Sequence, residues 1–216
     1  MATYPVAFDI QRPEKFDRVQ VALRLAVLLV LAILAGAIGW IFGLLYLAIP
    51  IWAAILISQK GAETYLAERG GPMLTLLRWY LALYAYMFLL TDRFPTEKPE
   101  EAIRFEVAPS GSPTVGSALL RLIMSIPSAF VLGILGIVGF FIWIIAAVSV
   151  LIQESYSEGL WNFQLAISRW NARLLAYHAS LVGEYPPFAV DTGPEEAPAA
   201  GADQPPAPAP EGPTQA

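Results

Sequence analysis

The chain contains no cysteine and a single histidine among its 216 residues, and only 14% of it is charged. Without cysteine it offers no disulfide, no thiolate metal ligand and no cysteine nucleophile. It also lacks a cluster of metal-ligating residues and a glycine-rich loop followed by Lys and Ser or Thr. We therefore expect a non-enzymatic protein with no metal and no cofactor. We expect His178 to be an ordinary surface or headgroup contact, not a catalytic base.

Basic residues are few, with 13 Lys and Arg against 18 Asp and Glu. Six of the acids follow position 183, where no basic residue occurs, which leaves the rest of the chain close to neutral. Since no polar segment carries a basic stripe, we expect no nucleic-acid partner. The segment 191–216 is rich in Pro, Ala and acids, and we expect it to be disordered. The polar first 17 residues favour a chain without a cleaved signal peptide.

Hydrophobic residues, in contrast, make up 56% of the chain and dominate two apolar stretches, 21–58 and 118–153. Each stretch holds one charged side chain, Arg24 in the first and Arg121 in the second. Such stretches are typical of integral membrane proteins. As one helix the first would be about 57 Å long, almost twice the ~30 Å hydrocarbon core of a bilayer. We therefore predict two transmembrane helical hairpins, over 19–58 and 115–154.

Glycines lie near the middle of each apolar stretch, and we expect the hairpins to turn there. They are Gly36, Gly39 and Gly43 in the first stretch, and Gly133, Gly136 and Gly139 in the second. The alternative is a small-residue face for helix packing. Hairpin arms of about 18 residues would be about 27 Å long, so either full spanning or wedging into one leaflet stays open.

The chain also contains an internal repeat. A shift of 97 residues superposes Phe8 on Phe105, Arg24 on Arg121 and Gly36 on Gly133, and a shift of 91 superposes Arg78-Trp79 on Arg169-Trp170 and Tyr86 on Tyr177. We predict two tandem repeats, 1–96 and 97–190, before the tail 191–216. Each contains a short strand, a hairpin and an Arg-Trp helix. The strand signal is the alternation of Val6, Phe8 and Ile10, and again of residues 103–107.

The Arg-Trp helices are predicted over 73–91 and 158–182. In the second, apolar residues share one face while Arg169 and Arg173 lie on the other, which favours an amphipathic helix in the membrane interface. The first is more apolar, so a further membrane span is the alternative there. The predicted fold is thus an all-α membrane protein with four transmembrane helices. The Lys and Arg distribution places both termini in the cytoplasm.

The candidate lipid or partner contacts are the matched arginines and the aromatic residues near them. They are Arg24, Arg121, Arg78, Trp79, Arg169, Trp170, Arg173, Tyr185 and Phe188. Arg24 and Arg121 would pair with a lipid phosphate or with an acid of the other repeat. The simpler alternative is that each long side chain snorkels to the membrane surface. The expected partners are the bilayer, including anionic headgroups, and other membrane protein subunits.

The second half carries a specific motif. It begins with Arg121-Leu122 and Ile126-Pro127, continues with Arg169-Trp170, Arg173 and Ala176-Tyr177, and ends with Glu184-Tyr185-Pro186-Pro187-Phe188. This motif resembles the bacterial membrane proteins grouped as the domain of unknown function 4389. The resemblance covers residues 5–188 in two copies, although the first lacks the Ile-Pro and ends on Phe94-Pro95 alone. It implies a bacterial plasma (inner) membrane location and brings no known activity.

Three functions agree with these observations. The first is a scaffold or accessory subunit of a larger membrane assembly, because polar residues through the membrane are almost absent. The second is a small transporter or lipid-handling protein with a site between the repeats. The third is a membrane-shaping protein, in which incompletely spanning hairpins and amphipathic helices expand one leaflet.

Overall fold

The computed structural model describes residues 4–33, 37–68, 70–95 and 98–191, and for residues 27–43 only the backbone elements. The elements are β1 (Val6–Asp9), α1 (Arg18–Ile33), α2 (Ala37–Lys60), α3 (Ala62–Ala67), α4 (Pro72–Met87), η1 (Pro99–Glu101), β2 (Arg104–Val107), α5 (Val115–Met124), α6 (Ile126–Gln153) and α7 (Glu158–His178). The fold is mainly helical, as predicted, but it also contains a small sheet. The disorder predicted for the tail falls on 192–216, outside the described residues.

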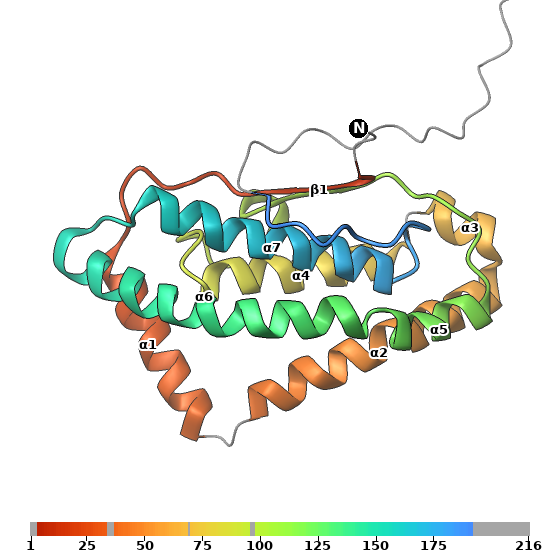
Figure 1. Cartoon of the computed structure of the whole chain (residues 1–216), viewed down its shortest axis with the longest axis horizontal. Coiled ribbons are helices and arrows are strands. Elements are labelled where there is room, and N and C mark those ends of the chain that lie inside the picture. Colours follow the sequence, from red (N-terminus) through yellow and green to blue (C-terminus); the bar gives the residue numbers. More distant parts are fainter. Residues whose placement is uncertain (1–3, 34–36, 69, 96–97, 192–216) are drawn as a thin grey trace, which may run out of the picture.

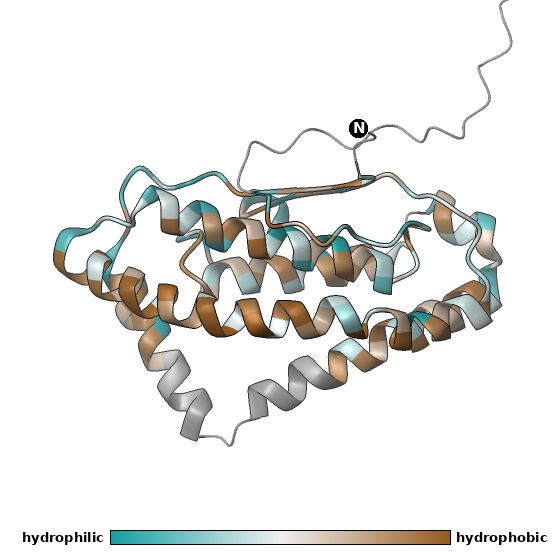
Figure 2. Ribbon diagram, viewed as in Figure 1, coloured by the Kyte–Doolittle hydropathy of each residue, from teal (hydrophilic) through white to brown (hydrophobic). Residues whose placement is uncertain are grey.

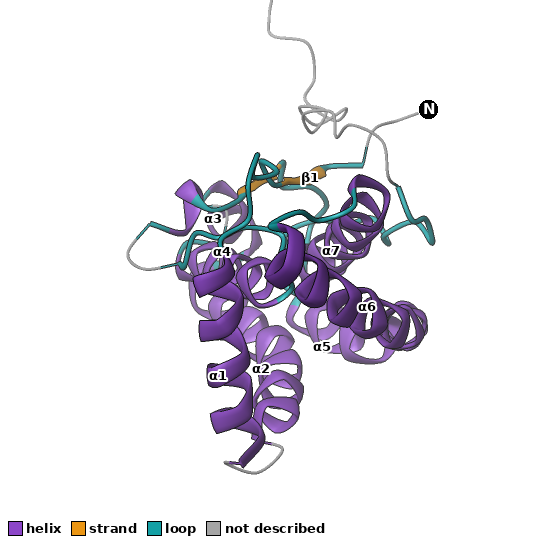
Figure 3. Cartoon of the chain, turned by 90° about the vertical axis from the view of Figure 1, so that its left-hand side faces the viewer, coloured by secondary structure: helices purple, strands orange, loops and turns teal. Residues whose placement is uncertain are grey.

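The elements form layers (Figure 1). The two strands lie at the top of this view, with α4 and α7 directly beneath them. The pairs α1–α2 and α5–α6 lie on the side away from the strands, and Figure 3 shows them on either side of the molecule. The polar loops and the apolar helices therefore face opposite ways.

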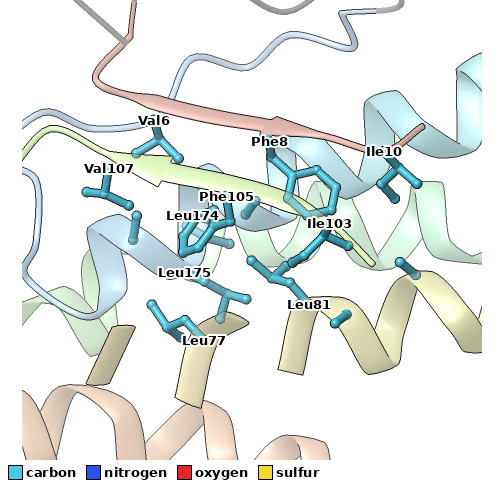
Figure 4. Packing of buried hydrophobic residues seen from close by; sticks show 14 of the residues in the cluster. Val6, Phe8, Ile10, Leu77, Leu81, Ile103, Phe105, Val107, Leu174 and Leu175 are labelled. Carbon is cyan, nitrogen blue, oxygen red and sulfur yellow. The ribbon is translucent and has the colours of Figure 1, made fainter. Parts of the chain in front are cut away.

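The two predicted strands exist, and they pair with each other. β1 and β2 are antiparallel, with Phe8 opposite Phe105. Both phenylalanines are buried, and their rings meet edge to face at 6.5 Å. Figure 4 shows the apolar side chains of both strands directed at Leu77 and Leu81 of α4 and at Leu174 of α7. The strands thus cover one side of the α4–α7 layer and complete the core.

The second apolar stretch does not form a hairpin. Helices α5 and α6 are separated by Ser125 alone, which keeps right-handed helical angles (φ −80°, ψ −11°). Gly133, Gly136 and Gly139 lie inside α6, so the predicted turn at these glycines is wrong. Pro127, the second residue of α6, explains where the small break occurs, because proline has no N–H for the preceding helical turn. Interior glycines lower helix stability by about 1 kcal/mol each but do not force a reversal.

The first apolar stretch contains α1 and α2, which converge at the bottom of Figure 1. The residues that join them, 34–36, lie outside the described residues, and so does the predicted turn at Gly36. Pro50 lies inside α2.

Helix α7 is the central element of the core, not a surface helix. Fifteen of its 21 residues are buried, among them Arg169 (3% exposed) and Arg173 (8% exposed). The prediction that it lies in the membrane interface with these arginines outward is therefore wrong. Acidic groups from distant parts of the chain compensate the charges on its polar face, as described below, and this permits burial. Helix α4 is buried on one side only, and Trp79 on its outer side is 42% exposed.

Strongly hydrophobic residues follow one another along α6 (Figure 2), and most of the large exposed apolar side chains that the structure describes lie on α5 and α6. Large exposed side chains there include Ile123, Phe130, Ile137 and Phe141, which are 60–68% exposed. In the described part of the chain, Val115–Gln153 is the one helix long and apolar enough to cross a membrane, judged by length and composition. Core helices of soluble proteins also pass such a test, but they are mostly buried, whereas 22% of this apolar window is buried. Leu44–Lys60 is apolar and shorter. The four predicted spans are not supported.

Candidate functional site

Arg24 of α1 is held inside the protein. Its guanidinium lies 4.1 Å from the centre of the Tyr86 ring and donates to the carbonyl oxygen of Thr91 at 2.7 Å. It also pairs with the Asp92 carboxylate at 2.9 Å. Since Arg24 is 0% exposed, the predictions that it contacts a lipid phosphate or snorkels to the surface are both wrong. Its partner acid belongs to the same half of the chain.

Arg121 of α5 has a similar environment. Its guanidinium lies 4.4 Å from the centre of the Tyr177 ring and donates to the carbonyl oxygens of Tyr177 and Val182. Arg121 is 7% exposed, so it too is an internal anchor and not a lipid contact. Each of the two arginines thus fastens the first helix of an apolar stretch to the C-terminal end of α4 or α7.

The ends of α4 and α7 also share one backbone geometry. Leu89 and Ser180 both have left-handed angles, with φ of 61° and 59°. The N–H of Leu90 donates to the carbonyl of Ala85, and that of Leu181 donates to the carbonyl of Ala176. This six-residue closure is the Schellman end of a helix. In each half a carbonyl oxygen just after this closure accepts the hydrogen bond of the buried arginine: Thr91 accepts from Arg24, and Val182 accepts from Arg121.

The motif residues of the second half form one cluster. Trp170 meets the Phe188 ring edge to face at 5.6 Å, and Phe188 stacks on Tyr185 at 5.7 Å. Arg169 donates to Asp9 of β1 at 2.9 Å and to the backbone carbonyl of Asp191 at 3.2 Å. The segment after α7 is thereby held along α7, and this cluster stabilises the fold.

The other predicted contacts are divided between this cluster and the surface. Arg173 lies 3.9 Å from the Asp191 carboxylate and belongs to the same cluster. Arg78 and Trp79 lie on α4, in the other half of the chain, with Trp79 exposed. Phe188 is 57% exposed despite its ring contacts. Trp79 and Phe188 therefore keep a surface that a lipid or a protein would reach.

A cavity of about 390 Å³ lies between four helices. Its lining residues are Leu45, Tyr46 and Ile49 of α2, Tyr80 and Tyr84 of α4, Ala129, Leu132 and Gly133 of α6, and Ile167, Asn171, Leu174 and Leu175 of α7. None of these residues is charged. The volume falls in the range of small-molecule sites, about 300–1,000 Å³. The chemistry of the lining suits an apolar ligand with few hydrogen-bonding groups.

A polar network borders the cavity at Tyr46. The Tyr46 hydroxyl is hydrogen-bonded to Ser125 Oγ, and Ser125 Oγ lies 3.0 Å from His178 Nδ1. His178 Nε2 donates to the Tyr46 carbonyl at 2.7 Å, and the two rings stack at 4.1 Å. Burial lowers the pKa of His178 to about 4, so the imidazole is neutral near pH 7.

His178 is 0% exposed, so the predicted surface or headgroup contact is wrong. Ser125 is 0% exposed as well. Both side chains are enclosed by the protein, and the network joins α2 to the end of α7.

The sequence predictions missed the cavity residues. The segments that form its walls carry no local sequence pattern that indicates a cavity. The one available signal was the 91-residue shift, which pairs positions of the two halves. That shift places Tyr80 on Asn171 and Tyr84 on Leu175, so both halves contribute matching positions to the wall. The predicted site near Arg24 and Arg121 is instead occupied by structural contacts.

These features define a mainly helical protein with one strongly apolar side and a cavity, lined by uncharged residues, between helices of its two halves. Residues 116–190 match the family model of the domain of unknown function DUF4389. The match includes α6, α7 and the aromatic cluster after α7, and it does not extend to the first half of the chain. No curated protein and no solved structure matches the sequence.

Proposed function

We propose that this chain is a non-enzymatic, bacterial plasma-membrane protein, built by internal duplication, that binds the acyl chain of a lipid between its two halves. The observation that carries the proposal is the uncharged cavity of about 390 Å³, which is walled by two helices from each half. Neither catalysis nor a cofactor is part of the proposal.

Matched contacts support the duplication. The strand register places Phe8 opposite Phe105, which are equivalent under the 97-residue shift, as expected for copies related by a two-fold axis. Arg24 over Tyr86 and Arg121 over Tyr177 are equivalent pairs. The Trp143 indole donates to the carbonyl of Met87, and the Tyr46 carbonyl accepts from His178, which is the same pair of positions exchanged between copies.

The exposed apolar side supports the membrane location. Ile123, Phe130 and Phe141 on this side are 60–68% exposed. Leaving apolar surface in contact with water costs roughly 25 cal/mol per Å² of accessible area, and a bilayer would remove that cost. The strands and polar loops lie on the other side, toward which the positive-inside rule directs the cytoplasm. Both termini are then cytoplasmic, as we predict from the sequence.

The cavity is best tested by filling it. Gly133 lines it, and a Cβ added there meets nothing within 4 Å, so Gly133→Leu adds a large side chain at the wall of the cavity. Gly136→Leu is the matched control, since Gly136 lies one turn further along α6 and also has open space around it. We expect the purified protein to retain bound lipid, measured by mass spectrometry of the extract. Gly133→Leu should lose it and Gly136→Leu should keep it; equal lipid content in the two variants would refute the proposal.

A second candidate function is an accessory subunit of a membrane assembly. Together α5 and α6 span 39 residues, about 58 Å of helix, so if they cross a ~30 Å core, apolar side chains remain beyond the lipid. A protein partner would cover them. Crosslinking in native membranes should then give a stoichiometric product, whereas a monomer in every mild detergent would argue against a partner.

Membrane shaping is the remaining alternative, and it requires α5 and α6 to lie in the membrane plane. Labelling of Ile137→Cys should then fail from both sides of the membrane.

A further inference from the structure

The hydrogen-bonding side chains that line the cavity are few: Tyr46 of α2, whose hydroxyl is bonded to Ser125, and a group on the helices α4 and α7. The Tyr80 hydroxyl is hydrogen-bonded to the side chain of Asn171. The ring of Tyr84 lies one turn further along α4, between Tyr80 at 6.5 Å and Phe88 at 4.2 Å. The Tyr84 hydroxyl has no hydrogen-bond partner among the described residues. Because Tyr84 lines the cavity, an unpaired donor belongs to the wall of a space large enough for a ligand.

The charge on this wall is as informative as its shape. No Lys or Arg lines the cavity, so a carboxylate drawn into it would be desolvated without a counter-ion. Burial raises the pKa of Tyr84, and so does the neighbouring Tyr80, which keeps the hydroxyl protonated. A neutral phenol donates one hydrogen bond to an acceptor. The matching ligand has an uncharged acceptor next to a hydrocarbon chain.

We infer that the cavity selects an esterified acyl chain over a free fatty acid, and that Tyr84 donates its hydroxyl hydrogen to the ester carbonyl. This inference rests on the proposed function, since it names the ligand class of the same cavity. The exposed apolar helices α5 and α6 would lie among esterified lipids in a membrane, and α6 forms one wall of the cavity. An acyl chain would therefore enter from the bilayer without crossing water.

The experiment measures binding of three radiolabelled probes with one chain length to the purified full chain in a single detergent at pH 8. The probes are methyl palmitate, palmitate and hexadecane. We expect methyl palmitate to bind most tightly. Tyr84→Phe should lower the affinity for methyl palmitate by about 2- to 10-fold, the effect of one neutral hydrogen bond, and leave that for hexadecane unchanged. Tyr156→Phe is the matched control, because the Tyr156 hydroxyl is buried, has no partner among the described groups and does not line the cavity.

The outcomes separate the inference from the proposed function. If palmitate binds as tightly as its methyl ester, or if Tyr84→Phe leaves the ratio of ester to hexadecane affinity unchanged, the inference is overturned while lipid binding stands. If Gly133→Leu binds all three probes as the unaltered protein does, the cavity is not the site and the proposed function itself fails. Circular dichroism of each variant checks that loss of binding is not loss of fold.

Discussion

Leu89 and Ser180, the equivalent left-handed residues at the ends of α4 and α7, allow a direct test of how backbone strain and side-chain burial affect the free energy of unfolding. Ser180 has φ 59° and is 0% exposed, and its hydroxyl has no partner among the described groups. Ser180→Gly should relieve about 1–2 kcal/mol of left-handed backbone strain and about 1 kcal/mol of unpaired hydroxyl burial. The greater freedom of glycine in the unfolded chain opposes this by roughly 0.5–1 kcal/mol. The net expectation is stabilisation by about 2 kcal/mol.

Leu89→Gly is the matched variant with the opposite sign. Leu89 has φ 61° and gains the same backbone relief, but its 0% exposed side chain belongs to the core. Removing a buried leucine side chain costs about 2–5 kcal/mol, so this variant should be destabilised by about 3 kcal/mol. The helix ends would thus respond oppositely to one substitution.

Thermal unfolding in detergent, followed by circular dichroism, measures both effects. For a chain of this size 1 kcal/mol moves Tm by about 2–4 °C, so Ser180→Gly should raise Tm by about 4–8 °C and Leu89→Gly should lower it by about 6–12 °C. Ser180→Ala removes the hydroxyl and keeps the strain, which separates the two contributions. A lower Tm for Ser180→Gly, or equal shifts for the two glycine variants, would refute the reasoning.

Three further predictions concern single contacts in the same unfolding assay. Asp92→Asn leaves the 0% exposed Arg24 without its carboxylate and should destabilise by about 3 kcal/mol, which the double variant with Arg24→Met should largely recover. Gly70→Ala places a Cβ 2.7 Å from Leu181 Cδ2 at φ +69° and should destabilise by about 2 kcal/mol, whereas Gly116→Ala, in open space on α5, should be neutral or stabilising. Because the folded pKa of His178 lies at about 4, below its ordinary 6.5, the unfolded chain takes up the proton first. Stability should fall by about 3 kcal/mol as pH drops from 6.5 to 4, and His178→Met should remove that part of the pH dependence.

The local elements follow from local signals, and the sequence predicts them well. Alternation over Val6, Phe8 and Ile10 predicts the strand that β1 forms, and apolar periodicity predicts α4 and α7 to within a few residues at each end. Such patterns suffice because strand and helix periods depend on neighbours in the chain. The boundary between residues 96 and 97 stays a prediction, since it lies outside the described residues.

The shape of the second apolar stretch required the structure. Length and central glycines predict a hairpin, but α6 continues through Gly133, Gly136 and Gly139. Glycine permits a turn without requiring one, and no other residue near the middle of α6 interrupts its hydrogen bonds. The small break falls at Ser125, two residues before Pro127. Proline has no backbone N–H, so it cannot donate a hydrogen bond to the preceding helical turn.

By itself, the sequence determined that this chain is apolar over two stretches, that each holds one arginine, and that matched Arg-Trp helices follow. Only the tertiary structure decided where the charges lie. Arg169 is buried because Asp9, 160 residues away, accepts its hydrogen bond, and Arg24 is buried because Asp92 lies beside it. A helical period assigns both arginines to a polar face but does not say what covers that face. The cavity arises in the same way, from four helices whose contacts no local pattern contains.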